Sequence, residues 1–235
     1  MSSVCMKPVG GTRMRLTKVD ECGVPLTGPG SCSIVSKGFV SVARTAQFAD
    51  PDEFLVKNAG GEICLNERSA PTFQWYNFEI TFCEVDPEIV NLLTGSPLVM
   101  DDATTPRAVG FRTREGANVN ANVALELWTR MGGRNCSGGQ AQYGYYLAPL
   151  IVEGYVGDLT FENGPASFVV TGARSKGGGG WGVGPYDVVN ATAGTPGPSP
   201  LLQPMTDLDH DHFQMTTLAP PAVPAECGCV ELAAA

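Results

Sequence analysis

The segment Pro71–Gly95 most constrains the fold, because it predicts a long strand that leads directly into a short helix. Apolar side chains recur at every second position before the helix, which is the period of a half-buried strand. These side chains are Tyr76, Phe78, Ile80 and Phe82. The segment therefore predicts a β-rich domain that packs one small helix against its strands.

A short helix is predicted over Asp86–Leu93. Asp86 supplies an N-cap oxygen, Pro87 suits the first helical position, and Glu88 complements the positive end of the helix dipole. Gly95 is placed to end the helix. The apolar stripe that would pack on the strands consists of Ile89, Val90, Leu92 and Leu93. We expect the Asp86 cap to contribute roughly 1 kcal/mol to stability.

Further strands are predicted along most of the chain. Alternating or β-branched residues mark them at 13–18, 38–48, 54–58, 62–66, 108–114, 122–131, 143–155 and 166–174. Ala59-Gly60-Gly61 predicts a hairpin connection, since glycine tolerates positive φ. Segment 143–155 is apolar on both faces, and Pro149 marks an edge or a bulge within it. Residues 1–190 are therefore predicted to form a β-domain with one helix near 86–94.

The remaining residues, 191–235, differ in composition. Ala191–Pro204 is rich in proline and predicts an extended linker. Asp207–Leu218 has the composition of one more strand, and the residues after it resemble an acidic tail. Just before this region, Gly177–Gly180 predicts a flexible loop that carries Trp181 and Tyr186.

Charge excludes one class of function. The formal net charge is −9, and all 15 basic residues lie at or before Lys176. Tight binding to nucleic-acid phosphates needs clustered Lys and Arg, so we expect no measurable affinity for duplex DNA. The acidic C-terminal part is interpreted first as a solvated tail. The alternative is a repulsive surface along which a polyanion slides without sticking.

No segment approaches the roughly 20 apolar residues that span a bilayer, so no membrane anchor is expected. Residues 1–11 lack the apolar core of a secretory signal, so synthesis in a cytosol is expected. The eight cysteines lie at 5, 22, 32, 64, 83, 136, 227 and 229, without a C-x-x-C pair. Because disulfide frameworks are typical of small secreted domains, we expect mostly reduced thiols that behave as small apolar groups.

The residues do not form a convincing catalytic set. The run Asp209–His212 holds both histidines, yet it has no third element and is interpreted as a solvated strand rather than a metal or acid–base site. Lys176 precedes the glycine run, whereas in a phosphate-binding loop it would follow the glycines and open a helix. We expect no catalytic residue, no metal, no cofactor and no enzyme activity.

Trp181 and Tyr186 need an explanation of their own, because large aromatics on a glycine loop are costly unless something buries them. They fold back onto the same subunit or they anchor a neighbouring one. The sequence leaves these two alternatives open.

Three stretches together resemble the major tail tube proteins of long-tailed, siphovirus-type bacteriophages, especially those that infect actinobacteria. They are RLTKVDECGVPLTGPG (Arg15–Gly30), FEITFCEVDPEIVNLLTG (Phe78–Gly95) and GWGVGPYDVV (Gly180–Val189). The resemblance covers most of the chain up to about Val189. It implies two packed antiparallel sheets, sandwich- or barrel-like, with one short flanking α-helix and long loops.

The resemblance also implies a function. Subunits would join into hexameric rings, and the rings would stack into the tube through which duplex DNA leaves the virion without specific binding. The partners implied are further copies of the chain, the tape measure protein, and the tail terminator and distal tail proteins. The chain would be made in the host cytoplasm and located in the virion tail. Six copies at −9 give about −54 per ring, which discourages DNA from adhering to the wall.

Two contacts between subunits are expected. In the tail tube family a long loop stacks one ring on the next, and residues 48–71 correspond to it here, with Phe54 and Leu55 as contact candidates. The glycine loop supplies the second set, Trp181, Pro185 and Tyr186. The alternative function is a β-sandwich or jelly-roll binding module or virion decoration protein. A metal-dependent enzyme that uses Asp209–His212 is a distant third.

Overall fold

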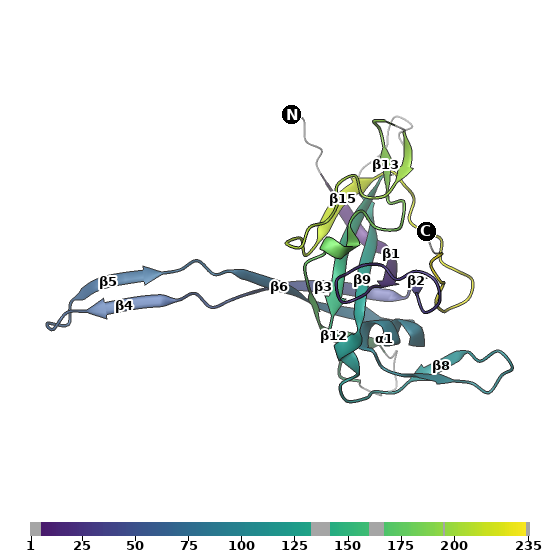
Figure 1. Cartoon of the computed structure of the whole chain (residues 1–235), viewed down its shortest axis with the longest axis horizontal. Coiled ribbons are helices and arrows are strands. Elements are labelled where there is room, and N and C mark those ends of the chain that lie inside the picture. Colours follow the sequence, from purple (N-terminus) through teal and green to yellow (C-terminus); the bar gives the residue numbers. More distant parts are fainter. Residues whose placement is uncertain (1–5, 133–141, 160–166, 195, 234–235) are drawn as a thin grey trace.

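The computed structural model describes residues 6–132, 142–159, 167–194 and 196–233 (Figure 1). The expected fold class is confirmed: antiparallel strands dominate, and one short helix packs beside them. The main sheet has nine strands in the order β2-β1-β9-β10-β12-β6-β3, with β11 paired to β12 and β15 paired to β10. Its strands are β1 (Pro8–Lys18), β2 (Ser33–Ser36), β3 (Phe39–Phe48), β6 (Phe73–Phe82), β9 (Asn122–Met131), β10 (Tyr143–Val152), β11 (Tyr155–Val156), β12 (Phe168–Ser175) and β15 (His212–Thr216).

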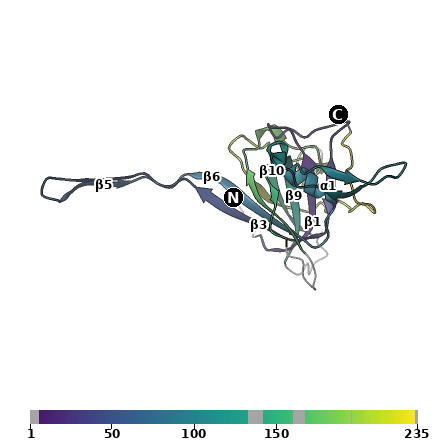
Figure 2. The same ribbon diagram turned by 90° about the horizontal axis from the view of Figure 1, so that it is seen from below.

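Two hairpins project from this body in opposite directions (Figures 1 and 2). The longer one is formed by β4 (Glu53–Lys57) and β5 (Ile63–Arg68), and the shorter one by β7 (Leu98–Met100) and β8 (Ala108–Phe111). The sequence predicts the first hairpin and the second strand of the other. It gives no signal for β7, which is only three residues long.

The strand-to-helix prediction at residues 71–95 is confirmed. β6 leads into α1 (Pro87–Thr94), and the Glu88 backbone N–H donates to Asp86 Oδ1 at 2.9 Å. Gly95 ends the helix with φ 67°, and its N–H donates to the Asn91 carbonyl. Gly95 adopts a left-handed backbone conformation, in which a residue with an L side chain would be strained.

The first core lies between α1 and one face of the main sheet. It gathers side chains from β1, β2, β6, β9, β10 and β12, so strands far apart in the sheet order share one interior. Its large, fully buried members include Met14, Leu16, Phe78, Phe82, Ile89 and Leu93. In Figure 1, β3 and β6 run across the direction of β9, so the two ends of the sheet approach this core from different directions.

A second core lies on the opposite face of β9 and β10. Both faces of β10 are therefore buried, as its uniformly apolar sequence predicts. The ladder between β9 and β10 shifts register between Ala148 and Ile151, which confirms the bulge expected near Pro149. The members of the second core include Trp128, Tyr145, Leu147, Leu150, Trp181, Val188, Leu201 and Met205.

The glycine run Gly177–Gly180 is not a flexible loop, contrary to the sequence-based expectation. An added Cβ on Gly177 would overlap the Asp207 backbone, and one on Gly178 would overlap the Pro149 ring. Gly180 approaches the backbone of Cys22 in the same way. Glycine is needed at these positions because the neighbouring backbone and the Pro149 ring leave no room for a side chain. This close packing places Trp181 in the second core.

The proline-rich segment 191–204 was expected to be an extended linker, and this expectation is wrong. β13 (Val189–Ala191) pairs with β14 (Gly197–Ser199), and Leu201 and Met205 are buried in the second core. The strand expected within 207–218 is present as β15 and pairs with β10. Residues 176–218 are thus part of the β-domain rather than an arm beside it.

A charged pair is buried where the second core meets β1. Arg15 Nε and Nη2 donate to the two Glu126 oxygens at 2.5 and 2.6 Å, and the Glu126 side chain is 0% exposed. Tyr145 Oη donates to the same carboxylate at 2.8 Å. Burial is the largest single effect on the pKa of Arg15 and lowers it, but the attraction of Glu126 and its hydrogen bonds, with smaller effects of Tyr186 and Tyr145, together outweigh burial and raise the pKa. Arg15 therefore stays charged within the fold.

We expect Glu126→Gln to destabilise the protein by about 3 kcal/mol, because it leaves the Arg15 charge buried without a counterion. Glu153→Gln is the matched control, since it removes the half-exposed ion pair with Arg174. That control should cost at most about 1 kcal/mol. Urea denaturation measures the free energy of unfolding of both variants. Equal losses would contradict the prediction that the buried ion pair matters more to stability than the half-exposed one.

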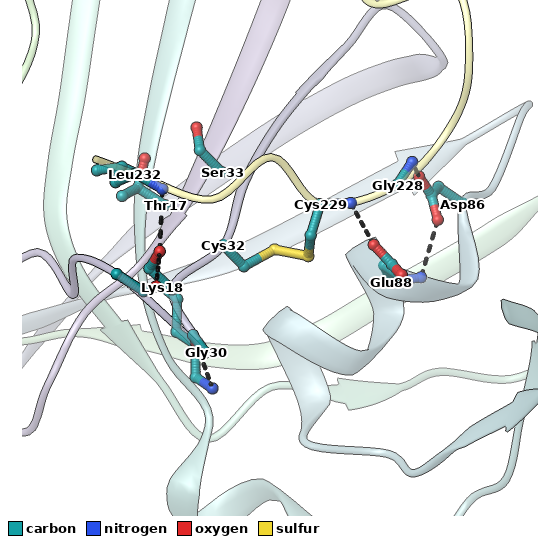
Figure 3. The surroundings of a disulfide bond; sticks show 12 residues. Thr17, Lys18, Gly30, Cys32, Ser33, Asp86, Glu88, Gly228, Cys229 and Leu232 are labelled. Carbon is teal, nitrogen blue, oxygen red and sulfur yellow. Dashed lines mark hydrogen bonds between the residues drawn. A yellow bond between two sulfur atoms is a disulfide. The ribbon is translucent and has the colours of Figure 1, made fainter. Parts of the chain in front are cut away.

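The C-terminal strap (residues 219–233) is tied to the body by a disulfide between Cys32 and Cys229 (Figure 3). The expectation of mostly reduced thiols is therefore wrong for these two residues. The bond was missed because 197 positions separate the cysteines, and sequence spacing does not reveal such a pairing. Cys22, Cys64, Cys83 and Cys227 are free, whereas Cys5 and Cys136 lie outside the described residues.

Hydrogen bonds hold the strap on either side of the disulfide (Figure 3). Gly228 N–H donates to Asp86 Oδ2 at 2.8 Å, and Cys229 N–H donates to the Glu88 carboxylate. Ser33 and Val230 exchange two backbone hydrogen bonds of 2.9 and 3.0 Å. Asp86 thus caps α1 with one oxygen and holds the strap with the other, so the helix start and the chain end stabilise each other.

We expect Cys229→Ser to lower the free energy of unfolding by about 2–4 kcal/mol, because the bond closes a loop that spans most of the chain. Cys227→Ser, two residues away, should have little effect under the same oxidising conditions. Denaturation with and without a reductant measures the difference. Equal stability of Cys229→Ser and the oxidised parent protein would contradict a stabilising role of the disulfide.

Candidate subunit interface

The β4–β5 arm (residues 53–68) extends away from the body (Figures 1 and 2). All of its residues are exposed, and within the described residues its two strands pair only with each other. A two-stranded hairpin in water is marginally stable at best and gains stability by packing on a surface. Such a surface would have to come from outside the chain, because the body does not cover the arm.

One face of the arm is largely apolar. Phe54 and Val56 lie on it by strand alternation, and Leu65 and Glu67 share it because they pair with Val56 and Phe54. Phe54 is 57% exposed, although it is a large aromatic residue. The opposite face carries the ion pair between Glu53 and Arg68, together with Leu55. An apolar face that no part of the subunit covers is typical of a protein–protein contact.

Local hydrogen bonds define the tip of the arm. Asn58 Oδ1 accepts from the backbone N–H groups of Gly60 and Glu62 at 3.0 and 2.9 Å. Gly61 adopts a positive φ of 83°, a value that glycine tolerates better than other residues. The tip is therefore a formed turn, and the expected hairpin is confirmed with its strands displaced by one or two residues.

The base of the arm is fixed by aromatic contacts. The rings of Phe48 and Phe73 meet edge to face with centroids 6.0 Å apart, where β3 ends and β6 begins. Phe73 also packs on Tyr76 and on His210. These contacts join the ends of β3 and β6, the two strands that lead into the arm, to the segment before β15.

The glycine-loop candidates do not all have the same environment. Trp181 is 4% exposed within the second core of its own chain, which agrees with the alternative that it folds back. The Arg15 guanidinium carbon lies 3.3 Å from the centroid of the Tyr186 ring. The Tyr186 hydroxyl forms hydrogen bonds with the hydroxyls of Thr17 and Ser33, and burial raises the pKa of Tyr186. Pro185 is exposed. The structure thus brings Trp181 and Tyr186 together but places Phe54 and Leu55 on the distant arm.

The outer edge of β3 is a third surface that the sequence did not single out. β3 ends the strand order of the main sheet, so within the described residues no strand pairs with its outer edge. Val40 on this strand is 61% exposed. A ten-residue edge strand presents unpaired backbone groups to another chain. A single sequence gives no signal for this, because strand order depends on long-range pairing.

The residues of the Asp209–His212 run bind separate partners. Asp209 accepts from Thr206, His210 shares a 2.8 Å hydrogen bond with Ser175, and Asp211 pairs with Arg44. Among the described residues, no group of three or more His, Cys, Asp or Glu is placed to hold a metal ion. In the same part of the chain, no helix has the length and apolar character needed to cross a membrane.

Comparison with known proteins gives no match to a protein-family model and none to a curated protein. The function is therefore argued from the geometry described above.

Protonation of His210 should destabilise the fold. Partial burial lowers the pKa of His210 below its ordinary value near 6.5. The folded state thus favours the neutral ring, and this stabilising contribution is lost as the pH falls through about 6.5. We expect the free energy of unfolding to fall between pH 7.5 and 5.5, and to fall less in His210→Gln.

Urea denaturation at the two pH values measures this effect. His212→Gln is the matched control, because His210 and His212 are the only histidines. The control should keep the pH dependence of the parent protein. An unchanged pH dependence in His210→Gln would show that other groups cause it.

Proposed function

We propose that this chain is a structural virion protein of the tail tube type, which forms six-membered rings that stack into a conduit for DNA. The observation that carries the proposal is the β4–β5 arm, a projecting hairpin whose exposed apolar side chains are covered by none of the described residues of its own subunit. An arm of this kind fits a contact with another copy, because it projects well beyond the body (Figure 1).

Two further features support assembly with itself. The open edge of β3 is suited to pairing with a strand of a neighbouring copy, and closing a ring removes such edges. The formal charge of −9 is suited to a wall along which DNA passes without adhering. The chain's part in this function is structural: it shapes and lines a passage.

The test replaces the arm by a tight turn. Asp52 and Ser69 already exchange hydrogen bonds of 2.9 and 3.0 Å, so an Asn-Gly turn can close the chain in place of residues 53–68. We expect the shortened protein to keep its circular dichroism spectrum and thermal stability but to form no tubes in negative-stain electron microscopy. The reason is that the deletion removes a contact surface and no core residue.

A point variant controls for the deletion. Phe54→Ser with Val56→Ser should weaken tube formation more than Leu55→Ser, because Phe54 and Val56 share the apolar face. Normal tubes from the shortened protein would remove the arm from the assembly contact. Compact single particles from the full-length protein would instead favour the binding or decoration module.

A further inference from the structure

The C-terminal strap holds two cysteines, Cys227 and Cys229, that a single residue separates. Cys229 forms the disulfide with Cys32, and Cys227 is a free thiol exposed to solvent. A thiol next to a disulfide is a potential nucleophile for it, because a disulfide breaks when a thiolate attacks one of its two sulfur atoms. The bond between Cys32 and Cys229 is therefore not the only one that these three cysteines permit.

The backbone allows the two strap cysteines to bond to each other. Residues two apart in a chain have Cα atoms about 5–7 Å apart, since each peptide unit spans about 3.8 Å. This range overlaps the roughly 4.4–6.8 Å that a disulfide requires. The residue between the two cysteines is Gly228, whose φ of 125° shows that the chain already uses the freedom of glycine here.

Burial decides which sulfur atom Cys227 attacks. Cys32 is 5% exposed, whereas Cys229 is exposed. Attack on the Cys32 sulfur would draw Cys227 into the body and displace the strap by two residues, which breaks the bridge between Ser33 and Val230. Attack on the Cys229 sulfur takes place within the strap. The second route is therefore the accessible one.

The exchange balances without an oxidant or a reductant. The Cys227 thiol loses its proton, and the thiolate attacks the Cys229 sulfur. The Cys227–Cys229 bond forms while the Cys32–Cys229 bond breaks, and the electron pair of the broken bond stays on the Cys32 sulfur, which takes up a proton. The product has one disulfide, as the starting protein does. Its new thiol, on Cys32, is buried as a small apolar group.

We propose that Cys227 is an internal nucleophile that unties the C-terminal strap by thiol–disulfide exchange. The Cys32–Cys229 bond and the Cys227–Cys229 bond are then two interchanging states of one chain. In the first state the strap is covalently joined to the body beside β2, and in the second it is held by hydrogen bonds alone. This activity goes beyond the proposed function and does not depend on it.

The strap covers the outer edge of β2. This strand stands at one end of the strand order of the main sheet, and across its edge Ser33 and Val230 exchange two backbone hydrogen bonds. Gly28 N–H donates to the Leu232 carbonyl at 2.8 Å, and Leu232 N–H donates to Ser31 Oγ at 2.9 Å. Because an uncovered edge presents unpaired backbone groups, the exchange controls how firmly this edge is protected.

Docking of the strap determines which bond is favoured. While the strap is docked, the hydrogen bonds of Gly228, Cys229 and Val230 hold Cys229 beside Cys32 (Figure 3). Once the strap undocks, the Cys32–Cys229 bond constrains the whole free segment, whereas the Cys227–Cys229 bond closes only a small ring. The first bond then costs more chain entropy, so undocking shifts the equilibrium towards the second.

The surroundings of Cys227 keep the exchange slow near neutral pH. Burial, followed by the carboxylates of Asp86 and Glu84, raises the pKa of Cys227. The charged side chains of the two hollows that Cys227 lines are four carboxylates and two cations: Glu84, Asp86, Glu88, Glu226, Lys37 and Arg107. Because only the thiolate attacks, the rate should rise roughly tenfold for each pH unit below the pKa.

The test weakens docking without changing a cysteine. Val230→Pro removes the N–H that donates to the Ser33 carbonyl. At about pH 8.5 without added thiol, the ratio of the Cys227–Cys229 bond to the Cys32–Cys229 bond should rise by roughly tenfold over that of the parent protein.

Two further variants accompany Val230→Pro. Ser31→Ala removes only the acceptor of Leu232 N–H, so it is milder and should raise the ratio by roughly threefold. Ala222→Pro is the matched control on the strap, because the Ala222 N–H donates to no backbone carbonyl within the described residues. That control should keep the ratio of the parent protein.

Cleavage after Glu and Lys distinguishes the two states. Residues 22–37 then form one peptide with Cys22 and Cys32, and residues 227–231 form another with the two strap cysteines. Free thiols are first blocked with a maleimide in acid. The Cys32–Cys229 state gives the two peptides joined, with one blocked thiol on each. The Cys227–Cys229 state gives them separate, with two blocked thiols on the first and none on the second.

The controls identify the nucleophile. Cys227→Ser in the Val230→Pro background should keep Cys32 bonded to Cys229, whereas Cys22→Ser in that background should still release Cys32. The rate should not depend on protein concentration, because the step occurs within one chain. If Val230→Pro does not fold, Ser31→Ala decides. Absence of the Cys227–Cys229 bond from the folded variants, or a rate proportional to protein concentration, would overturn the assignment.

Discussion

The burial of β9 and β10 on both faces is the constraint on which the rest of the structure depends. A strand pair with one solvent-exposed face needs only one core. This pair is buried on both faces and therefore needs two, and residues 176–206 must supply the second. The same burial removes Glu126 from water, so Arg15 of the adjacent strand must supply its counterion. The ring of Tyr186 then covers the Arg15 guanidinium, which ties the glycine loop to this pair.

This constraint explains what the sequence could predict. Alternation marks β9, a uniformly apolar run marks β10, and the N-cap and glycine stop mark α1, because each signal lies within a few residues. The burial of Trp181 was left open, since a glycine-rich segment has the same composition whether it is solvated or close-packed. Only the approach of Asp207 and Pro149 to Gly177 and Gly178 distinguishes these states.

Long-range pairing accounts for the remaining errors. Cys32 and Cys229 are distant in sequence, and nothing local indicates that the strap crosses the start of α1. The proline-rich composition of segment 191–204 predicts an extended linker, yet proline does not prevent the three paired positions that form β14. Of the candidate site, the sequence located the arm and its turn, but not the open edge of β3.

The arm has an energetic consequence for assembly. Its apolar side chains stay in water in the single chain, so they contribute no burial energy to the fold; under the proposed function that energy is gained when another copy binds. The body is stabilised independently by two cores and a disulfide, which allows the arm to remain extended without unfolding the rest. Under the proposed function, stability and association are therefore assigned to different parts of the chain. That division would favour a stack of already folded subunits over a chain that folds as it assembles.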